Sequence, residues 1–176
     1  MRDTRAPETD SDLTQYLTFL IAGEEYAVGI LRVKEIIEHE AMTRLPGAPR
    51  CIRGVINLRG AVVPVVDLAI RFGLAPLEIT RRTCFVIVEL SNAGERLVVG
   101  LMADVVSSVV DLPAEEIEPV PAFGTVARAE HLKGLGKVGN KFTLILDLDR
   151  LLSDGDLFAL GAEVAASEAA LSAQVA

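Results

Sequence analysis

Residues 52–68, IRGVINLRGAVVPVVDL, form the most strongly patterned segment of the chain, and this pattern restricts the fold. Two runs rich in Val, Ile and Leu flank Arg59-Gly60, where glycine supplies the backbone freedom that a tight turn needs. The segment therefore predicts a β-hairpin. Pro64 has no backbone N–H, so we expect its strand to lie at a sheet edge or to carry a bulge there.

The second half of the chain repeats this pattern. Arg59-Gly60 falls opposite Gly139-Asn140, another pair that suits a tight hairpin. Two shifts relate the halves: 71 residues (99 − 28) for 28–30 onto 99–101, and 80 residues (133 − 53) for 53–55 onto 133–135 and for 64–68 onto 144–148. Repeated strand-and-turn units of this length predict two similar small β-barrels or sheets.

Further strands are expected on both sides of this hairpin. Residues 16–30 predict two strands joined by a turn at Ala22-Gly23-Glu24, and residues 82–90 and 95–110 are strand-like as well. Residues 31–38 fit either a continuing strand or one helical turn. The prediction is therefore an all-β fold with a few short helices.

The expected boundaries follow the composition. Residues 1–14 are charged and polar and are expected to be disordered. Residues 15–152 are expected to form the folded domain, with one subdomain over roughly 15–80 and the other over 81–152. Residues 153–176 are rich in alanine and are expected to form a C-terminal helix or tail.

Charge and composition exclude several classes of function. The net charge of −8 argues against a nucleic-acid surface, which depends on clustered Lys and Arg. The chain contains no run of roughly twenty apolar residues and no secretory signal, so we expect a cytoplasmic location. Cys51 and Cys84 are expected as free thiols, and His39 and His131 lack partners at metal-ligand spacing. No metal site and no cofactor are expected.

The sequence also lacks a convincing catalytic constellation. Asp67 and Asp147 occupy equivalent places in the two repeats, each before a short Leu-containing segment, and helix capping explains both. No phosphate-binding glycine motif lies between a strand and a helix. We therefore expect a chain that binds and does not catalyse.

Apolar residues occur on both faces of two expected strands. In one strand these are Val62, Val63, Val65 and Val66, and in the other they are Val105, Val106, Val109 and Val110. The interior of one small barrel has room for only one such set. The other set meets either the second barrel or a partner protein, and both alternatives stay open.

Three segments resemble a known family. FLIAGEEYAVGILRVKEI (19–36), RGVINLRGAVVPVVDL (53–68) and HLKGLGKVGNKFTLILDLDRLL (131–152) closely resemble the CheW coupling proteins of bacterial chemotaxis. The NLRG-x-x-x-P-V-x-D-L signature is specific for that family. The resemblance implies two intertwined five-stranded SH3-like barrels without catalytic activity. It also implies an adaptor that joins the cytoplasmic tip of methyl-accepting chemoreceptors to the regulatory domain of the histidine kinase CheA.

The resemblance also implies which residues meet each partner. A receptor-facing groove between the barrels is implied at Val33, Glu35, Gly54, Arg59, Gly60, Val106, Val109 and Gly134. Kinase contacts are implied at Val62 and Phe123, whereas Glu118 departs from the basic residue that some relatives carry. Because Glu35 and Arg59 would line the same groove, we expect their side chains to form an ion pair.

Two alternatives to this function remain. The same module could serve another receptor–kinase pathway, such as surface motility or second-messenger signalling, and co-purification of the native partners would separate these. A small-molecule-binding barrel or an enzyme is the alternative from a different class. It requires a polar, convergent pocket, and ligand-dependent thermal stabilisation would reveal it.

Overall fold

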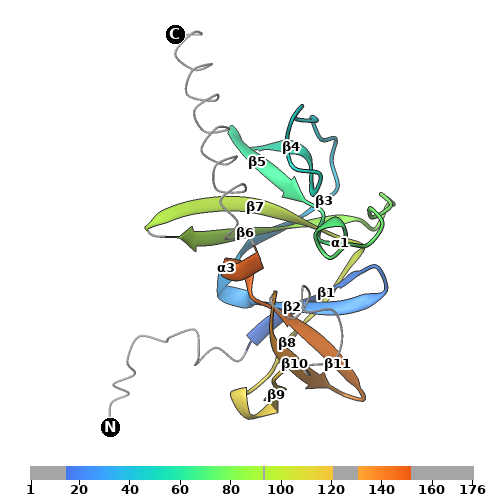
Figure 1. Ribbon diagram of the computed structural model, residues 1–176, viewed down its shortest axis with the longest axis vertical. Helices are drawn as coiled ribbons and strands as arrows, with labels where there is room; N and C mark the ends of the chain where they lie inside the picture. Colours follow the sequence, from blue (N-terminus) through green and yellow to red (C-terminus); the bar gives the residue numbers. More distant parts are fainter. Residues whose placement is uncertain (1–14, 93, 121–130, 152–176) are drawn as a thin grey trace.

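The computed structural model describes residues 15–92, 94–120 and 131–151, which form two β-sheets stacked along the long axis of the molecule (Figure 1). The first sheet has the strand order β8-β1-β2-β11-β10-β9, with β1 (Gln15–Ile21), β2 (Glu24–Gly29), β8 (Val105–Asp111), β9 (Ile117–Glu118), β10 (Leu132–Val138) and β11 (Lys141–Leu146). The second has the order β3-β6-β7-β5-β4, with β3 (Val33–Glu38), β4 (Ile52–Leu58), β5 (Ala61–Val66), β6 (Cys84–Asn92) and β7 (Glu95–Ala103). Short helical turns complete the described part: η2 (Ile30–Arg32), α1 (Leu68–Arg71), η3 (Ala114–Glu116) and α3 (Leu148–Leu151).

These elements confirm the predicted all-β class and most of the predicted hairpins. The turn at Ala22-Gly23 joins β1 to β2, and Arg59-Gly60 joins β4 to β5. Both alternatives for residues 31–38 occur in succession, because η2 precedes β3. The first sheet has six strands where five were expected, and the extra strand is the two-residue β9. The expected tails, 1–14 and 153–176, lie outside the described residues.

Each half of the chain contributes its first two strands to one sheet and its remaining strands to the other. β3 follows β2 along the chain but pairs with β6 in the second sheet, while β8 follows β7 but pairs with β1 in the first sheet. The expected division between 15–80 and 81–152 therefore separates the two sequence repeats and does not separate the two sheets. Each sheet is complete only when both halves of the chain have folded.

The single run expected over 95–110 divides at Asp104, where the chain passes between the sheets. The Asp104 backbone N–H donates to the Leu20 carbonyl oxygen at 2.9 Å, and the Ala22 N–H donates to Asp104 Oδ2, also at 2.9 Å. Ala22 has a positive φ of 52° in the β1–β2 turn. The carboxylate therefore ties the start of β8 to that turn.

Strand pairing corrects the alignment of the repeats. The parallel pairs Ala27↔Ile145 and Val65↔Gly100 are equivalent, which sets a shift of 100 − 27 = 73 residues. The bulges in β3, at Lys34, and in β8, at Ser107, give the same shift, 107 − 34 = 73. The predicted shift of 71 was therefore wrong by two residues. It matched two Val-Gly pairs, but register follows the pattern of pairing and burial and not residue identity.

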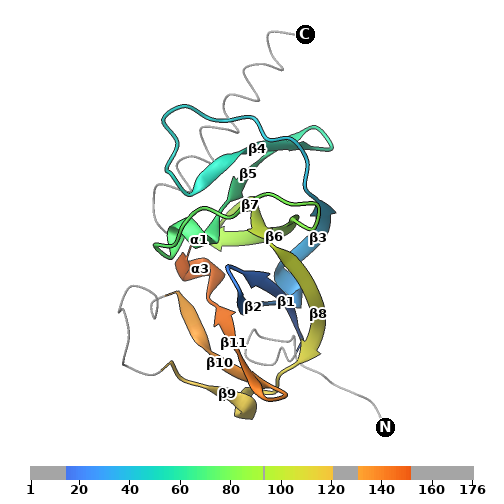
Figure 2. The ribbon, with the colours of Figure 1, turned by 90° about the vertical axis from the view of Figure 1, so that its right-hand side faces the viewer.

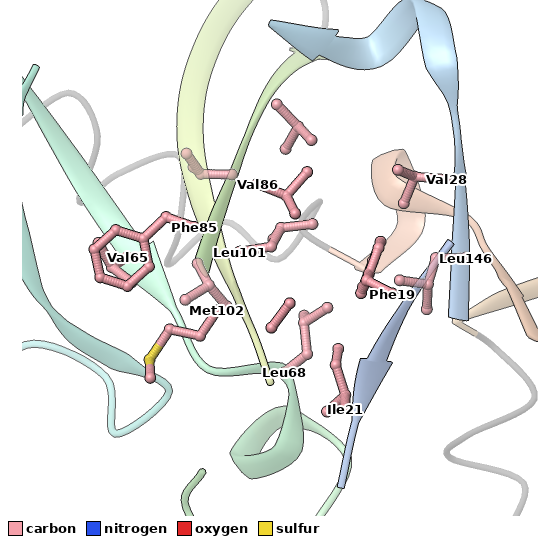
Figure 3. Packing of buried hydrophobic residues seen from close by; sticks show 14 of the residues in the cluster. Phe19, Ile21, Val28, Val65, Leu68, Phe85, Val86, Leu101, Met102 and Leu146 are labelled. Atoms are coloured by element: carbon pink, nitrogen blue, oxygen red, sulfur yellow. The ribbon is translucent and has the colours of Figure 1, made fainter. Parts of the chain in front are cut away.

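One hydrophobic core is shared by both sheets. Figure 3 shows Phe19, Val28 and Leu146 of the first sheet facing Val86 and Leu101 of the second, and the exposed fraction of each is 3% or less. A second, smaller cluster lies within the first sheet and comprises Tyr16, Ala27, Leu112 and Ile145. The two sheets therefore stabilise each other through apolar burial between them.

The shared core accounts for the apolar excess of β5. Val63, Val65 and Val66 are at most 2% exposed, although successive residues point to opposite faces. Both faces of β5 are therefore packed inside the molecule at these residues. The same is not true of β8, where Val109 is 51% exposed.

Pro64 lies in an interior strand, so the prediction of an edge strand was wrong. β5 has β4 on one side and β7 on the other. The pairing with β7 comprises only Val65 and Val66, so Pro64 precedes that ladder. The bulge lies in β4, between Ile52 and Gly54, and not at the proline itself.

Both aspartates cap helices, as predicted. Asp67 is fully buried, and its carboxylate accepts hydrogen bonds from Ala69 N, Leu77 N and Arg53 NH1 at 2.8–3.0 Å. Asp147 is only partly buried and accepts from Arg150 N at 3.2 Å. The first aspartate also fixes the segment after α1, whereas the second serves its own helix.

This difference predicts unequal losses of stability when each cap is removed. Asp67→Ala leaves the Arg53 guanidinium and the Leu77 N–H without their carboxylate, and should lower the free energy of unfolding by about 3–5 kcal/mol. Asp147→Ala is the matched control at the equivalent position and should cost about 1 kcal/mol. Urea unfolding of both variants measures the difference, and equal losses would show that the buried network adds nothing beyond a cap.

Candidate functional site

Two edge strands from different sheets lie on the same side of the molecule. β3 ends the strand order of the second sheet, and β8 ends that of the first. Figure 2 shows both strands along one side, with the β4–β5 hairpin turning toward the same side. This side therefore combines parts of both repeats.

Four apolar residues on these strands form what we call the β3–β8 surface: Val33 and Ile36 on β3, and Val106 and Val109 on β8. Ile36 lies opposite Val86, and Val109 lies opposite Leu17, and both of these partners are buried in the shared core. Residues directly opposite each other on neighbouring strands point to the same face of a sheet. The β3–β8 surface is thus the outer rim of the core, where Ile36 is 42% and Val109 51% exposed.

Ile36 was missed by the sequence analysis. With the shift of 73, Val106 is equivalent to Val33 and Val109 to Ile36, so the two sheets contribute matching residues. With the shift of 71, Val109 falls opposite Glu38, a charged residue (109 − 71 = 38). The correct register was the signal that would have identified Ile36.

Arg59 and Glu35 form the ion pair that was predicted. Arg59 NH1 and NH2 donate to Glu35 Oε1 and Oε2 at 3.0 and 2.7 Å, the bidentate geometry of a guanidinium on a carboxylate. The hydrogen bonds to Glu35, and then its negative charge, raise the pKa of Arg59. Because β3 and β4 are the first and last strands in the order of the second sheet, this pair joins the two ends of the sheet.

The pair lies at the border of the β3–β8 surface. Glu35 is adjacent to Ile36 on β3 but points to the opposite face of the strand, since Glu35 lies opposite Ile87 and Ile36 lies opposite Val86. The side chain of Arg59 is 76% exposed. Gly60 is exposed beside it in the turn. A partner that covers the apolar rim and reaches around the edge of β3 would therefore also meet a fixed, planar cation.

Gly54 and Gly134 are buried and do not reach this surface. A Cβ on Gly54 would lie 2.7 Å from the Thr43 carbonyl oxygen, and one on Gly134 would lie 2.7 Å from the Glu118 carbonyl oxygen. Both glycines therefore allow another strand to cross closely over the bulges of β4 and β10. Their effect on any partner is through the backbone that they position.

The residues expected to meet the kinase fall into two groups. Val62 is half-buried on β5, directly opposite Asn57 in the β4–β5 hairpin. Phe123 lies outside the described residues. Glu118, where the sequence departs from some relatives, is exposed at the end of β9.

The described part of the chain offers no group of three His, Cys, Asp or Glu side chains that could hold a metal ion. Among the same residues, none of the helices has the length and apolar character needed to cross a membrane. Cys51 is buried and Cys84 is half-buried, and the two side chains are thiols, as predicted.

Comparison with known proteins defines the class. The model of the CheW-like domain matches residues 15–156. Chemotaxis protein CheW from Klebsiella aerogenes is 38% identical over 143 residues, which cover 81% of this chain and 84% of that protein. Protein FrzA from Myxococcus xanthus is 33% identical over 140 residues, covering 78% of this chain and 84% of that protein.

A solved structure has the same fold. The crystal structure of the scaffolding protein TtCheW from Thermoanaerobacter tengcongensis superposes with a TM-score of 0.71 at 30% identity, covering 86% of this chain and 93% of that one. The two interlocked sheets are thus those of a scaffold protein that acts through protein contacts. The chain belongs to the CheW family. This is a family of non-catalytic adaptors in chemotaxis, so the expectation that the chain is not an enzyme is confirmed by its membership.

Proposed function

We propose that this chain couples the cytoplasmic tip of methyl-accepting chemoreceptors to the regulatory domain of the histidine kinase CheA. Membership of the CheW family supports an adaptor role in chemotaxis. The observation that carries the receptor half of the proposal is the β3–β8 surface. Its exposed Ile36 and Val109 continue the core of both sheets outward, and an apolar rim of this kind favours covering by a partner.

The receptor contact combines this apolar rim with a charged border. The apolar contacts would come from the β3–β8 surface, that is, from Val33, Ile36, Val106 and Val109. The charged border would come from Glu35, Arg59 and Gly60. Gly54 and Gly134 would act by holding the strands that carry or support these residues. Since the rim takes residues from both sheets, receptor binding would depend on how the two sheets are packed.

The kinase contact would use other residues. Val62 on β5 and Phe123 are the proposed contacts, and Val62 lies on the hairpin beyond the turn that carries Arg59. An adaptor with contacts for both partners would hold receptor and kinase together. The adaptor would work in the cytoplasm, recruited there to receptor arrays at the membrane.

A second candidate is the same adaptor role in another receptor–kinase pathway, such as surface motility or second-messenger signalling. The similarity to protein FrzA, at 33% identity, supports retaining this second candidate function alongside the chemotaxis role. Relatives that bear the name CheW reach similar values, such as 34% for the protein from Bacillus subtilis. Purification of the chain from its own cells, with identification of the receptor and the kinase that accompany it, distinguishes the two.

Charge substitutions on the β3–β8 surface should weaken receptor binding. Ile36→Lys and Val109→Lys each place an ammonium group in the apolar rim, and each should weaken binding of a receptor cytoplasmic fragment by about ten- to a hundredfold, the range of interface hot spots. Ile79→Lys is the matched control, because Ile79 is 43% exposed but lies in the segment between α1 and β6. Titration calorimetry measures the three affinities. Equal affinities for all three variants would remove the surface from the proposal.

The ion pair should matter for signalling more than for folding. Arg59→Glu places two carboxylates together at the exposed border, and we expect it to impair receptor-dependent kinase activation while the melting temperature barely changes. Adding Glu35→Arg re-creates a pair of opposite polarity and should restore part of the activation. Kinase assays on reconstituted receptor complexes test this with both single variants and the double variant. Full activation by Arg59→Glu would contradict a role for this residue, and additive losses would contradict a role for the pairing.

A further inference from the structure

The turn that carries Arg59 has an unfavourable backbone conformation. Arg59 has φ = 52° and Gly60 has φ = 88°, so both central residues of this hairpin turn have positive φ, as in a type I′ turn. Asn, Asp and Gly are preferred at the first of these positions, and a residue with a long side chain is strained there. Such strain persists only where the surroundings hold it, and it is typical of functional positions.

The equivalent hairpin in the other repeat avoids this strain. There the turn is Gly139-Asn140, and the residue in the place of Arg59 is Gly139, with φ = 63°. The residue in the place of Glu35 is Ser108 (108 − 73 = 35), which has no carboxylate to receive a guanidinium. The strained turn therefore occurs in the repeat that has the ion pair.

A side chain holds the strained turn in place. Asn57 Oδ1 accepts a hydrogen bond from Gly60 N at 2.8 Å. This N–H belongs to the peptide unit that follows Arg59, so the bond fixes the orientation of the peptide on which the Arg59 conformation depends. The equivalent residue in the other hairpin is Lys137 (137 − 80 = 57), whose ammonium group cannot accept a hydrogen bond.

We propose that Asn57 is a positioning residue for the Arg59–Glu35 pair. By holding the Arg59-Gly60 peptide, it keeps Arg59 in the left-handed conformation from which both guanidinium nitrogens reach the Glu35 carboxylate at 3.0 and 2.7 Å. The signalling consequence rests on the proposed function. If Arg59 borders the receptor contact, Asn57 sets the orientation of the cation that the receptor meets.

The test compares five single variants, Asn57→Ala, Asn57→Asp, Lys137→Ala, Arg59→Gln and Glu35→Gln, and the double variant that combines Asn57→Ala with Arg59→Gln. Asn57→Ala removes the acceptor, Asn57→Asp keeps an oxygen that accepts from Gly60 N, and Lys137→Ala is the matched control in the equivalent hairpin. The first readout is the NMR signal of the Arg59 Nε–H group in the full chain, which reports whether the guanidinium is held. Asn57→Ala should move this signal toward the position that it has in a Glu35→Gln variant, and the other two should leave it in place.

The second readout is receptor-dependent kinase activation in reconstituted complexes. Asn57→Ala should lower it several-fold, to the level of Arg59→Gln, and the double variant should fall no further because both changes remove the same interaction. Asn57→Asp should retain full activation. An unmoved Arg59 signal in Asn57→Ala, or additive losses in the double variant, would overturn the positioning role. A third outcome is a moved Arg59 signal in Asn57→Ala together with full kinase activation by Arg59→Gln. This outcome would uphold the positioning role of Asn57 and overturn the proposed role of Arg59 in receptor coupling.

Discussion

Burial of apolar side chains between the two sheets is the interaction on which the rest of this structure depends. Phe19 and Val28 from one sheet and Val86 and Leu101 from the other are fully buried in one cluster, which only the packed pair of sheets can form. The crossing of the chain before β3 and before β8 adds to this dependence, because each sheet contains strands from both halves of the chain. Neither half can therefore keep its architecture alone.

The β3–β8 surface follows from the same crossing. The chain passes between the sheets before β3 and before β8, and each of these strands lies at an edge of its sheet. The matching residues Ile36 and Val109 are 42% and 51% exposed there, although they lie opposite buried residues of the core. Because the surface takes residues from both sheets, it depends on how the two sheets are packed.

Local sequence patterns predicted much of this fold and part of the site. Alternating apolar residues and turn glycines predicted the hairpins at Ala22-Gly23 and Arg59-Gly60, and the two aspartates predicted the helix caps. The ion pair of Arg59 with Glu35 was also predicted, from the family resemblance.

Properties that depend on long-range pairing could not be predicted from these patterns. Pro64 was expected at a sheet edge or at a bulge, because the missing N–H of proline does not show that the ladder with β7 begins only at Val65. Ile36 was missed because the repeat register was wrong by two residues, and burial of Gly54 and Gly134 depends on strands that cross over them. These features are set by which strands meet, and local sequence carries little information about that.

The most direct test of a receptor contact shared by both sheets is methyl NMR of the full chain during titration with a receptor cytoplasmic fragment. The account predicts that the methyl signals of Val33 and Ile36, from the second sheet, and of Val106 and Val109, from the first, change together with one affinity. The methyl signals of Ile79 should stay in place. Changes confined to the residues of a single sheet, or changes at Ile79 with the β3–β8 surface unaffected, would contradict the account.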